Sequence, residues 1–200
     1  HGRGAVVGDT IASLMEFCGF EVDREYYIND AGRQIQTLGR SVYLRCCQLA
    51  GRKVEFPEDA YQGDYIRDMA STAMAESGEL LFETEEDQAV EMPSRKAASE
   101  ILGGIRKDLE DLGISFDTWY SEQSLYDRGM VNSAIEYLKQ KKLVYEKDGA
   151  MWFAATQFGD EKDRVVVRQN GQTTYFASDI AYHMDKFQRG YDLVIDVWGA

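Results

Sequence analysis

The chain has 200 residues, of which 44% are hydrophobic, 12% are aromatic and only two are proline. This apolar content is sufficient to form a buried core and argues against a disordered chain. No apolar run approaches the ~18 residues of a membrane-spanning helix. The formal net charge of −13 excludes a protein that binds nucleic acid over a broad basic face, although a small local patch that contacts RNA stays open.

The first 51 residues predict a helix, a strand and a second helix. Apolar side chains recur at helical spacing over 5–20, and FEVDREYYI predicts a strand that ends at Ile28. The next helix is expected to end at Gly51, since glycine commonly follows a last helical turn. This order of elements is typical of a βαβ unit.

The middle of the chain has a different character. The stretch 52–93 is acidic, and we expect it to consist mainly of loops, with one helix near 65–76. Helical periodicity returns at Ala98 and stops at Gly113. ISFDTWYSE then predicts a strand, and the apolar spacing over 131–138 predicts a further helix.

The last part of the chain predicts two hairpins, a helix and a strand. The dipeptides Asp148-Gly149 and Asn170-Gly171 accept the positive φ of tight hairpin turns. A helix is expected near 178–188. The run DLVIDVWG is apolar almost throughout, which is typical of a parallel strand buried on both faces. The whole chain therefore predicts a parallel α/β sheet interrupted by insertions.

The cysteines do not suggest a metal site. Cys18, Cys46 and Cys47 lack the spacing of metal ligands, and two of them are adjacent within a predicted helix. We expect buried or idle thiols of a reducing cytosol, and no structural zinc.

The opening HGRGAVVG places three glycines at the start of a predicted helix. Free N–H groups and the positive end of the helix dipole suit a phosphate there, and His1 and Arg3 add donors. The pattern fits neither the dinucleotide nor the Walker motif. A glycine-rich start that serves only close packing is therefore an equally good reading.

A second candidate site combines Tyr175, Asp179 and Glu122. Tyr175 and Asp179 are four residues apart at a helix start, and Glu122 ends a predicted strand, where parallel sheets place ligand groups. A carboxylate beside a phenol suits a guanidinium or ammonium ligand. The structural alternatives are that Asp179 caps its helix, that Tyr175 packs in the core, and that Glu122 is a solvated loop carboxylate.

Several segments together resemble the catalytic domain of the arginyl-tRNA synthetases, in the order of that family and over essentially the whole chain. They are HGRGAVVGD, REYYINDAGRQI, LGRSVY, YQGDYI, FDTWYSE, DGAMWF, KDRVVVR, TTYFASDIAYHMDK and VIDVWGA. In that family an H-x-G-H motif is followed by Gly-Arg-Gly. His1 would be its second histidine, so we expect the chain to begin inside the ATP-binding signature.

The resemblance implies an α/β fold, the Rossmann-type parallel sheet of a class I synthetase with two insertions, truncated at both ends. The core would comprise 1–43, 96–121 and 173–200. The first insertion would span 44–95. The second, a helix plus β-hairpins, would span 122–172.

The resemblance also implies an activity and the residues that serve it. An arginine–tRNA ligase activates arginine with ATP and Mg²⁺ and transfers it to the 3′-terminal adenosine of the cognate tRNA. His1 would be catalytic and would bind ATP with Gly2 and Arg3. The arginine pocket would be lined by Tyr175, Asp179 and Glu122, and the possible active-site rim would include Asp30 and Gln34.

We expect arginine, ATP and tRNA as partners, with the tRNA held mainly by domains outside this chain, no membrane, and a cytoplasmic location. Expressed alone, the chain should not charge tRNA. Two alternatives remain. One is a non-catalytic paralogue that binds RNA or protein, and the other is a class I synthetase for another amino acid, whose pocket should not need two carboxylates.

Overall fold

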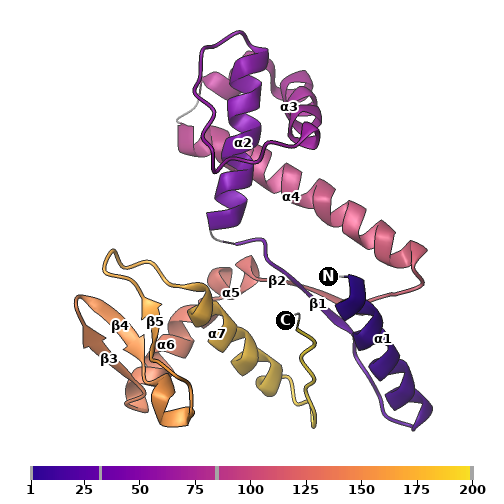
Figure 1. Cartoon of the computed structure of the whole chain (residues 1–200), viewed down its shortest axis with the longest axis vertical. Helices are drawn as coiled ribbons and strands as arrows, with labels where there is room; N and C mark the ends of the chain where they lie inside the picture. The colour runs from indigo at the N-terminus through magenta and orange to yellow at the C-terminus, as the bar shows by residue number, and fades with distance from the viewer. Residues whose placement is uncertain (1, 32, 84–85, 199–200) are drawn as a thin grey trace. The chain divides into compact units, whose positions relative to one another are not determined.

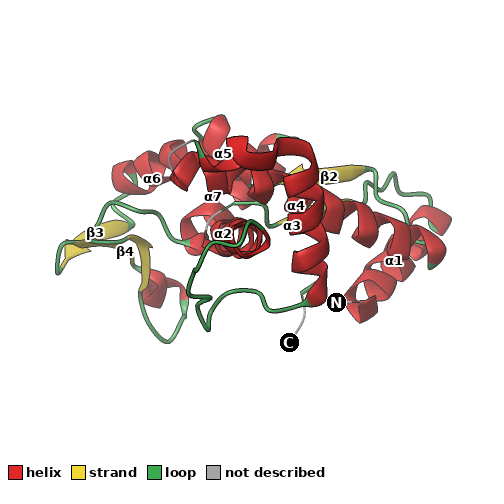
Figure 2. Cartoon of the chain, turned by 90° about the horizontal axis from the view of Figure 1, so that it is seen from above, coloured by secondary structure: helices red, strands yellow, loops and turns green. Residues whose placement is uncertain are grey.

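The computed structural model describes residues 2–31, 33–83 and 86–198 (Figure 1). It divides into a first unit, residues 1–29 and 116–200, and a second unit, residues 30–115. All five strands of the described residues lie in the first unit. Figure 2 shows strands in yellow among the more abundant helices.

The parallel sheet is present as a two-stranded pair in the first unit. β1 (Glu25–Ile28) runs parallel to β2 (Thr118–Ser121), and Tyr27 lies opposite Tyr120. Parallel strands need a long crossover connection, and the whole second unit is contained in this one. Both predicted strands are confirmed, although each is shorter than the stretches FEVDREYYI and ISFDTWYSE that predicted them.

α1 (Gly2–Phe17) precedes β1, and one arginine ties it to the start of that strand. Arg24 Nε lies 3.1 Å from Asp9 Oδ1, and Arg24 Nη1 lies 2.6 Å from Glu16 Oε1. The hydrogen bond to Glu16 raises the pKa of Arg24 above its usual range, so the guanidinium stays charged. Because α1 begins at Gly2, the glycine-rich opening stands at a helix start, as predicted.

An antiparallel sheet forms the other part of the first unit, with strand order β3-β4-β5. Two helices lead into it and a third follows it. The elements are α5 (Gln123–Asp127), α6 (Met130–Gln140), β3 (Val144–Lys147), β4 (Ala150–Phe153), η2 (Ala155–Phe158), β5 (Arg164–Val167) and α7 (Tyr175–Gln188).

The two predicted turns behave differently. Asp148 (φ 52°) and Gly149 (φ 71°) make the tight turn between β3 and β4, so the first hairpin is confirmed. At the second turn Gly171 also has positive φ, 80°. The returning chain, however, meets β5 through a single bridge between Val167 and Thr173, so no paired hairpin strand follows the turn.

The core of the first unit follows the periodicity of the sequence. α6 buries four residues at the spacing that predicted the helix, and α7 and β5 pack against the same cluster. The buried members of the cluster are Tyr120, Leu125, Val131, Ala134, Ile135, Val166, Ala177 and Ala181.

The second unit is helical, with α2 (Arg33–Leu49), α3 (Asp64–Ser77), η1 (Gly78–Phe82) and α4 (Glu86–Asp111). α2 and α4 approach closely at Gly39, where an added Cβ would stand 1.5 Å from Ser94 Oγ. Glycine is therefore required at this position for the two helices to pack.

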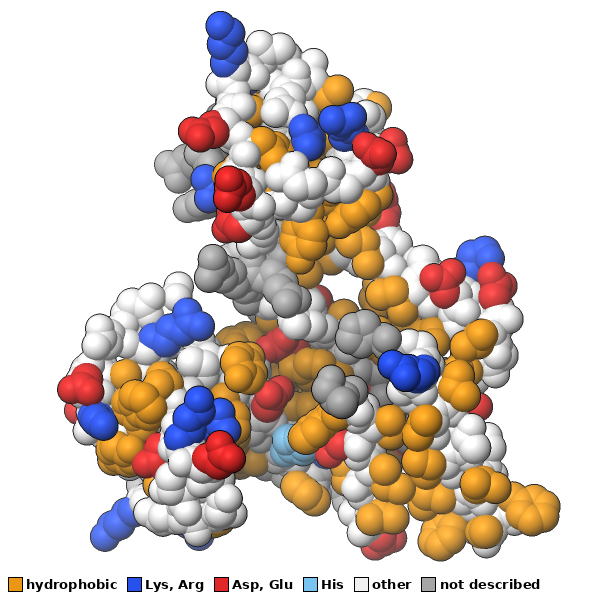
Figure 3. Space-filling view, in the orientation of Figure 1, with side chains coloured by type: hydrophobic (Ala, Val, Ile, Leu, Met, Phe, Trp, Pro, Cys, Tyr) orange, Lys and Arg blue, Asp and Glu red, His pale blue; other side chains and the backbone are white. Residues whose placement is uncertain are grey.

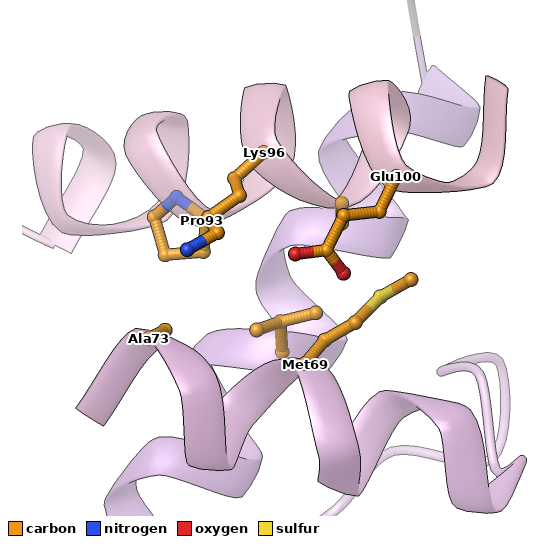
Figure 4. A pocket seen from close by; sticks show the side chains of 7 residues that line it. Met69, Ala73, Pro93, Lys96 and Glu100 are labelled. Carbon is orange, nitrogen blue, oxygen red and sulfur yellow. The ribbon is translucent and has the colours of Figure 1, made fainter. Parts of the chain in front are cut away.

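The prediction of loops up to residue 93 is wrong, because α4 begins at Glu86 and contains Pro93. Proline inside a helix removes one hydrogen bond and costs ~3 kcal/mol, which made it a plausible helix boundary. Pro93 is buried, however, and packing offsets that cost. Figure 4 shows it on α4 above α3, where Met69 and Ala73 line the same small pocket.

The prediction of a buried strand at DLVIDVWG is also wrong. No strand forms over 192–198, and Leu193 and Trp198 are 61% and 77% exposed. A parallel strand needs a neighbouring backbone to pair with, and none of the described strands forms a ladder with this segment. The outer face of α1 is apolar and exposed as well, and Figure 3 shows hydrophobic side chains gathered over it.

The thiols are placed as expected for Cys46 and Cys47, which are buried within α2, whereas Cys18 is exposed. Burial raises the pKa of Cys46 to about 11. Its Sγ is 3.6 Å from the carbonyl oxygen of Ala70.

Two further findings concern membrane spans and the limits of the units. No helix in the described part of the chain is both long and apolar enough to cross a membrane. Along the sequence, one compact unit gives way to the other at 29/30 and 115/116. The insertion limits 44–95 and 122–172 stay predictions.

Candidate active site

Glu122 is a buried carboxylate at the carboxyl end of β2. It follows the last strand residue, stands at the start of α5, and is 7% exposed. Its backbone N–H donates to the carbonyl of Ile28 at 3.0 Å. Its Oε1 accepts a 2.6 Å hydrogen bond from Ser178 Oγ. The alternative of a solvated loop carboxylate is therefore wrong.

Asp179 lies in the second turn of α7, beside Ser178, and its side chain is half-buried. Burial raises its pKa, and the nearby His183 and Lys186 oppose that shift. The N-cap of α7 is Thr174, so Asp179 is not the cap. A half-buried carboxylate without a capping role is a candidate for binding a cation.

Tyr175 is the first residue of α7 and is 75% exposed, so the alternative of a core tyrosine is wrong. Its carbonyl oxygen accepts a 2.9 Å hydrogen bond from Ser178 Oγ. The helix spacing puts Tyr175 and Asp179 on neighbouring turns, as predicted. That the phenol lines a pocket stays a prediction.

Tyr27 is a site candidate that sequence reasoning missed. Its hydroxyl is buried and makes no hydrogen bond of good geometry within the described residues. The Ser178 hydroxyl is nevertheless close enough to lower the pKa of Tyr27. Burial raises the pKa of Tyr27, and the negative charges of Glu122 and Asp179 raise it further. The Tyr27 phenol therefore lies near both candidate carboxylates. In the sequence, the stretch REYYI indicates only that Tyr27 is part of a strand.

A partly exposed polar cluster holds α7 against β1. Arg189 forms a two-pronged contact with Glu25, with Nη1 at 2.6 Å from Oε2 and Nη2 at 3.0 Å from Oε1. The Tyr182 hydroxyl also donates to Glu25. Burial, and then this hydrogen bond, raise the pKa of Tyr182, so the phenol stays neutral and donates.

A second set of contacts joins α7 to β2. Arg128 Nη1 is 3.3 Å from Asp185 Oδ1, and Arg128 Nη2 donates to the Tyr120 hydroxyl at 2.5 Å. Burial raises the pKa of Tyr120 to about 12. The acidic and aromatic residues that crowd the α7 sequence are thus divided. Tyr182 and Asp185 hold the helix in place, whereas Asp179 lies near Tyr27 and follows Ser178, the hydrogen-bond partner of Glu122.

Lys186 is 5% exposed and is paired with Asp196, beyond the end of α7. Its Nζ also lies 4.3 Å from the centre of the Tyr182 ring. This pair anchors the segment for which the sequence predicts a strand.

The remaining predicted residues belong to the glycine-rich opening and to the second unit. His1 lies outside the described residues, while Gly2 and Arg3 are exposed in the first turn of α1. Asp30 and Gln34 belong to the second unit, and the Gln34 side chain lies outside those described. Their roles stay predictions. In the described part of the chain, no three His, Cys, Asp or Glu side chains converge as metal ligands.

Comparisons with known proteins agree with the resemblance seen in the sequence. The chain matches the family described as tRNA synthetases class I (R), catalytic domain, over residues 1–197. It is 58% identical to the arginine–tRNA ligases of Geobacter sp. (strain M21) and Desulfosudis oleivorans over 200 residues, which is 100% of this chain and 36% of each relative. The chain thus spans about a third of the length of those relatives.

Solved structures give the same result. A putative arginyl-tRNA synthetase from Campylobacter jejuni superposes with a TM-score of 0.87 at 42% identity, covering 100% of this chain and 44% of that one. The Thermus thermophilus arginyl-tRNA synthetase, at 24% identity, shares the fold with a TM-score of 0.58 over 88% of this chain and 31% of its own. The predicted class I synthetase fold is confirmed, and the chain belongs to the family of class I (R) tRNA synthetase catalytic domains.

Proposed function

We propose that the protein containing this chain is an arginine–tRNA ligase. It forms arginyl-adenylate and pyrophosphate from arginine and ATP, and then transfers arginine to the 3′-terminal adenosine of the cognate tRNA. The observation that carries the proposal is that a buried carboxylate, Glu122, and a half-buried one, Asp179, both lie close enough to the Tyr27 phenol to raise its pKa. The names of the relatives support it.

The donor pattern of arginine explains why this site suits it. A guanidinium presents five N–H donors and no acceptor, and it pairs with carboxylates through two parallel hydrogen bonds. Glu122 and Asp179 offer only acceptors when ionised. A ligand with fewer donors, such as lysine or citrulline, leaves a buried carboxylate poorly paired, which can supply discrimination of ~10⁴.

The activation step needs positioning more than new functional groups. The carboxylate of arginine is itself the nucleophile that attacks the α-phosphorus of ATP, and pyrophosphate leaves. Donors at the α1 start, from Gly2, Arg3 and His1, would offset the charge on the phosphates. Mg²⁺ would arrive with ATP as part of the substrate. We place the enzyme in the cytoplasm, where its tRNA substrate is.

Arginine-dependent pyrophosphate exchange tests the proposal, measured with tRNA present in the protein that contains this chain. Exchange and tRNA charging are expected with arginine, and should fall by ~10⁴ with lysine at equal concentration. A protein that folds and binds tRNA but shows no exchange with any amino acid would instead be a non-catalytic paralogue. Exchange with an amino acid other than arginine would overturn the assignment of the pocket.

A further inference from the structure

Ser178 occupies an unusual place in the candidate site. It is fully buried, at 0% exposure, in the first turns of α7, between the residues Tyr175 and Asp179. Its Oγ lies 2.6 Å from Glu122 Oε1 and 2.9 Å from the carbonyl oxygen of Tyr175. The neighbouring residue on the helix is the second candidate carboxylate, Asp179. Ser178 therefore touches one carboxylate of the pair and adjoins the other along the backbone.

The hydroxyl has a single proton for two acceptors. The carboxylate is the stronger acceptor because a hydrogen bond to an ionised group is about twice as strong as a neutral one. The shorter of the two distances is also the one to Glu122. The proton of Ser178 thus goes to Glu122.

Other buried serines show what a purely structural hydroxyl does. Ser41 and Ser94, both in the second unit, donate to the carbonyl four residues earlier, at 2.6 Å in each case. Their donated bonds stay within one helix. Ser178 instead reaches 56 residues along the chain to a carboxylate on another element. This difference points to a role beyond satisfying its own hydroxyl.

We propose that Ser178 is a positioning residue for substrate arginine, a reading that rests on the function proposed above. Its hydroxyl fixes the orientation of the Glu122 carboxylate and, through the adjacent backbone, the spacing between Glu122 and Asp179. Two-pronged recognition of a planar guanidinium depends on that spacing. Ser178 itself does not touch the guanidinium.

The first test is Ser178→Ala in the protein that contains this chain. The KM for arginine is expected to rise about tenfold, the effect of losing one charge-assisted hydrogen bond, while kcat and the KM for ATP stay within about twofold. Ser178→Thr keeps the hydroxyl and should recover most of the loss. Ser41→Ala is the matched control, a fully buried serine in the other unit, and should leave the arginine KM unchanged.

A double-mutant cycle separates positioning from packing. In the Glu122→Gln background the charged acceptor is gone, so adding Ser178→Ala should raise the arginine KM by less than about twofold further. If the two fold-changes multiply instead, Ser178 acts independently of Glu122 and the proposal is overturned. If Ser178→Ala does not fold, Ser178→Cys takes its place, since a thiol of similar size is a weaker donor.

The outcomes also separate this proposal from the one it rests on. If Glu122→Gln and Asp179→Asn both leave arginine kinetics unchanged, the arginine pocket is misplaced and the proposed site fails. If those two variants raise the arginine KM but Ser178→Ala does not, only the positioning role is wrong.

Discussion

The two units bury different kinds of side chain. In the second unit the central cluster is apolar, and its fully buried polar residues in the described chain are serines that donate within their helices. In the first unit three charged residues, Glu122, Asp185 and Lys186, are buried. Burying a charge is costly unless it is paired. Among the described residues, buried charge is therefore found in the first unit, where Asp185 and Lys186 form ion pairs and Glu122 is a candidate ligand group, whereas the core of the second unit is built by helix packing.

The largest effect that would sharpen this comparison is expected at Asp179. Asp179→Asn keeps the shape of the side chain and removes its charge, so the fold should persist. The KM for arginine should increase by between tenfold and more than a hundredfold, which corresponds to a loss of about 1.5–3 kcal/mol of binding free energy. Arginine-dependent pyrophosphate exchange with tRNA present measures it. Wild-type kinetics in this variant would mean that the charge in the first unit is structural.

A change of packing in the second unit should alter stability only. At Gly39 an added Cβ meets Ser94 Oγ at 1.5 Å, so Gly39→Ala should lower the free energy of unfolding by about 1–3 kcal/mol. Gly103 in α4 has no atom within 4 Å of an added Cβ, and Gly103→Ala should instead stabilise the helix by up to ~1 kcal/mol. Thermal unfolding of both variants tests the difference. Equal Tm values would show that α2 and α4 do not approach closely.

Breaking one charge pair of the first unit is expected to cost about 1–2 kcal/mol. Arg189→Met leaves Glu25 without its two-pronged partner, and the Glu25 side chain is only 14% exposed. The value is set below that of a fully buried pair because Arg189 is 28% exposed. The surface pair of Lys107 and Asp111 is the control, and Lys107→Met should change unfolding by less than ~0.5 kcal/mol. An equally small effect at Arg189 would contradict the structural role of this cluster.

The smallest effect concerns thiol chemistry. The folded pKa of Cys46 is raised to about 11, so at pH 8 the reactive thiolate is present in the unfolded chain and nearly absent in the folded one. A thiol reagent should modify exposed Cys18 quickly, and Cys46 only after denaturation. Peptide mapping after a short exposure distinguishes the two. Equal modification rates would place Cys46 at the surface.

Local sequence patterns by themselves determined much of the fold. The α6 spacing depends only on the 3.6-residue period of a helix, and the turn at Asp148-Gly149 depends only on tolerance of positive φ. The candidate residues Glu122 and Asp179 follow from their chemical type, their element boundaries and the family motifs. These features are encoded within a few neighbouring residues, and a sequence displays them directly.

Tertiary structure decided what depends on distant partners. Pro93 lies inside a helix because packing against α3 offsets its missing hydrogen bond, and DLVIDVWG is no strand because no described strand pairs with it. Tyr27 and Ser178 join the site only when β1, β2 and α7 come together. A hydrogen bond between residues 56 apart leaves no periodic trace in the sequence, since it depends on where the folded chain places both ends.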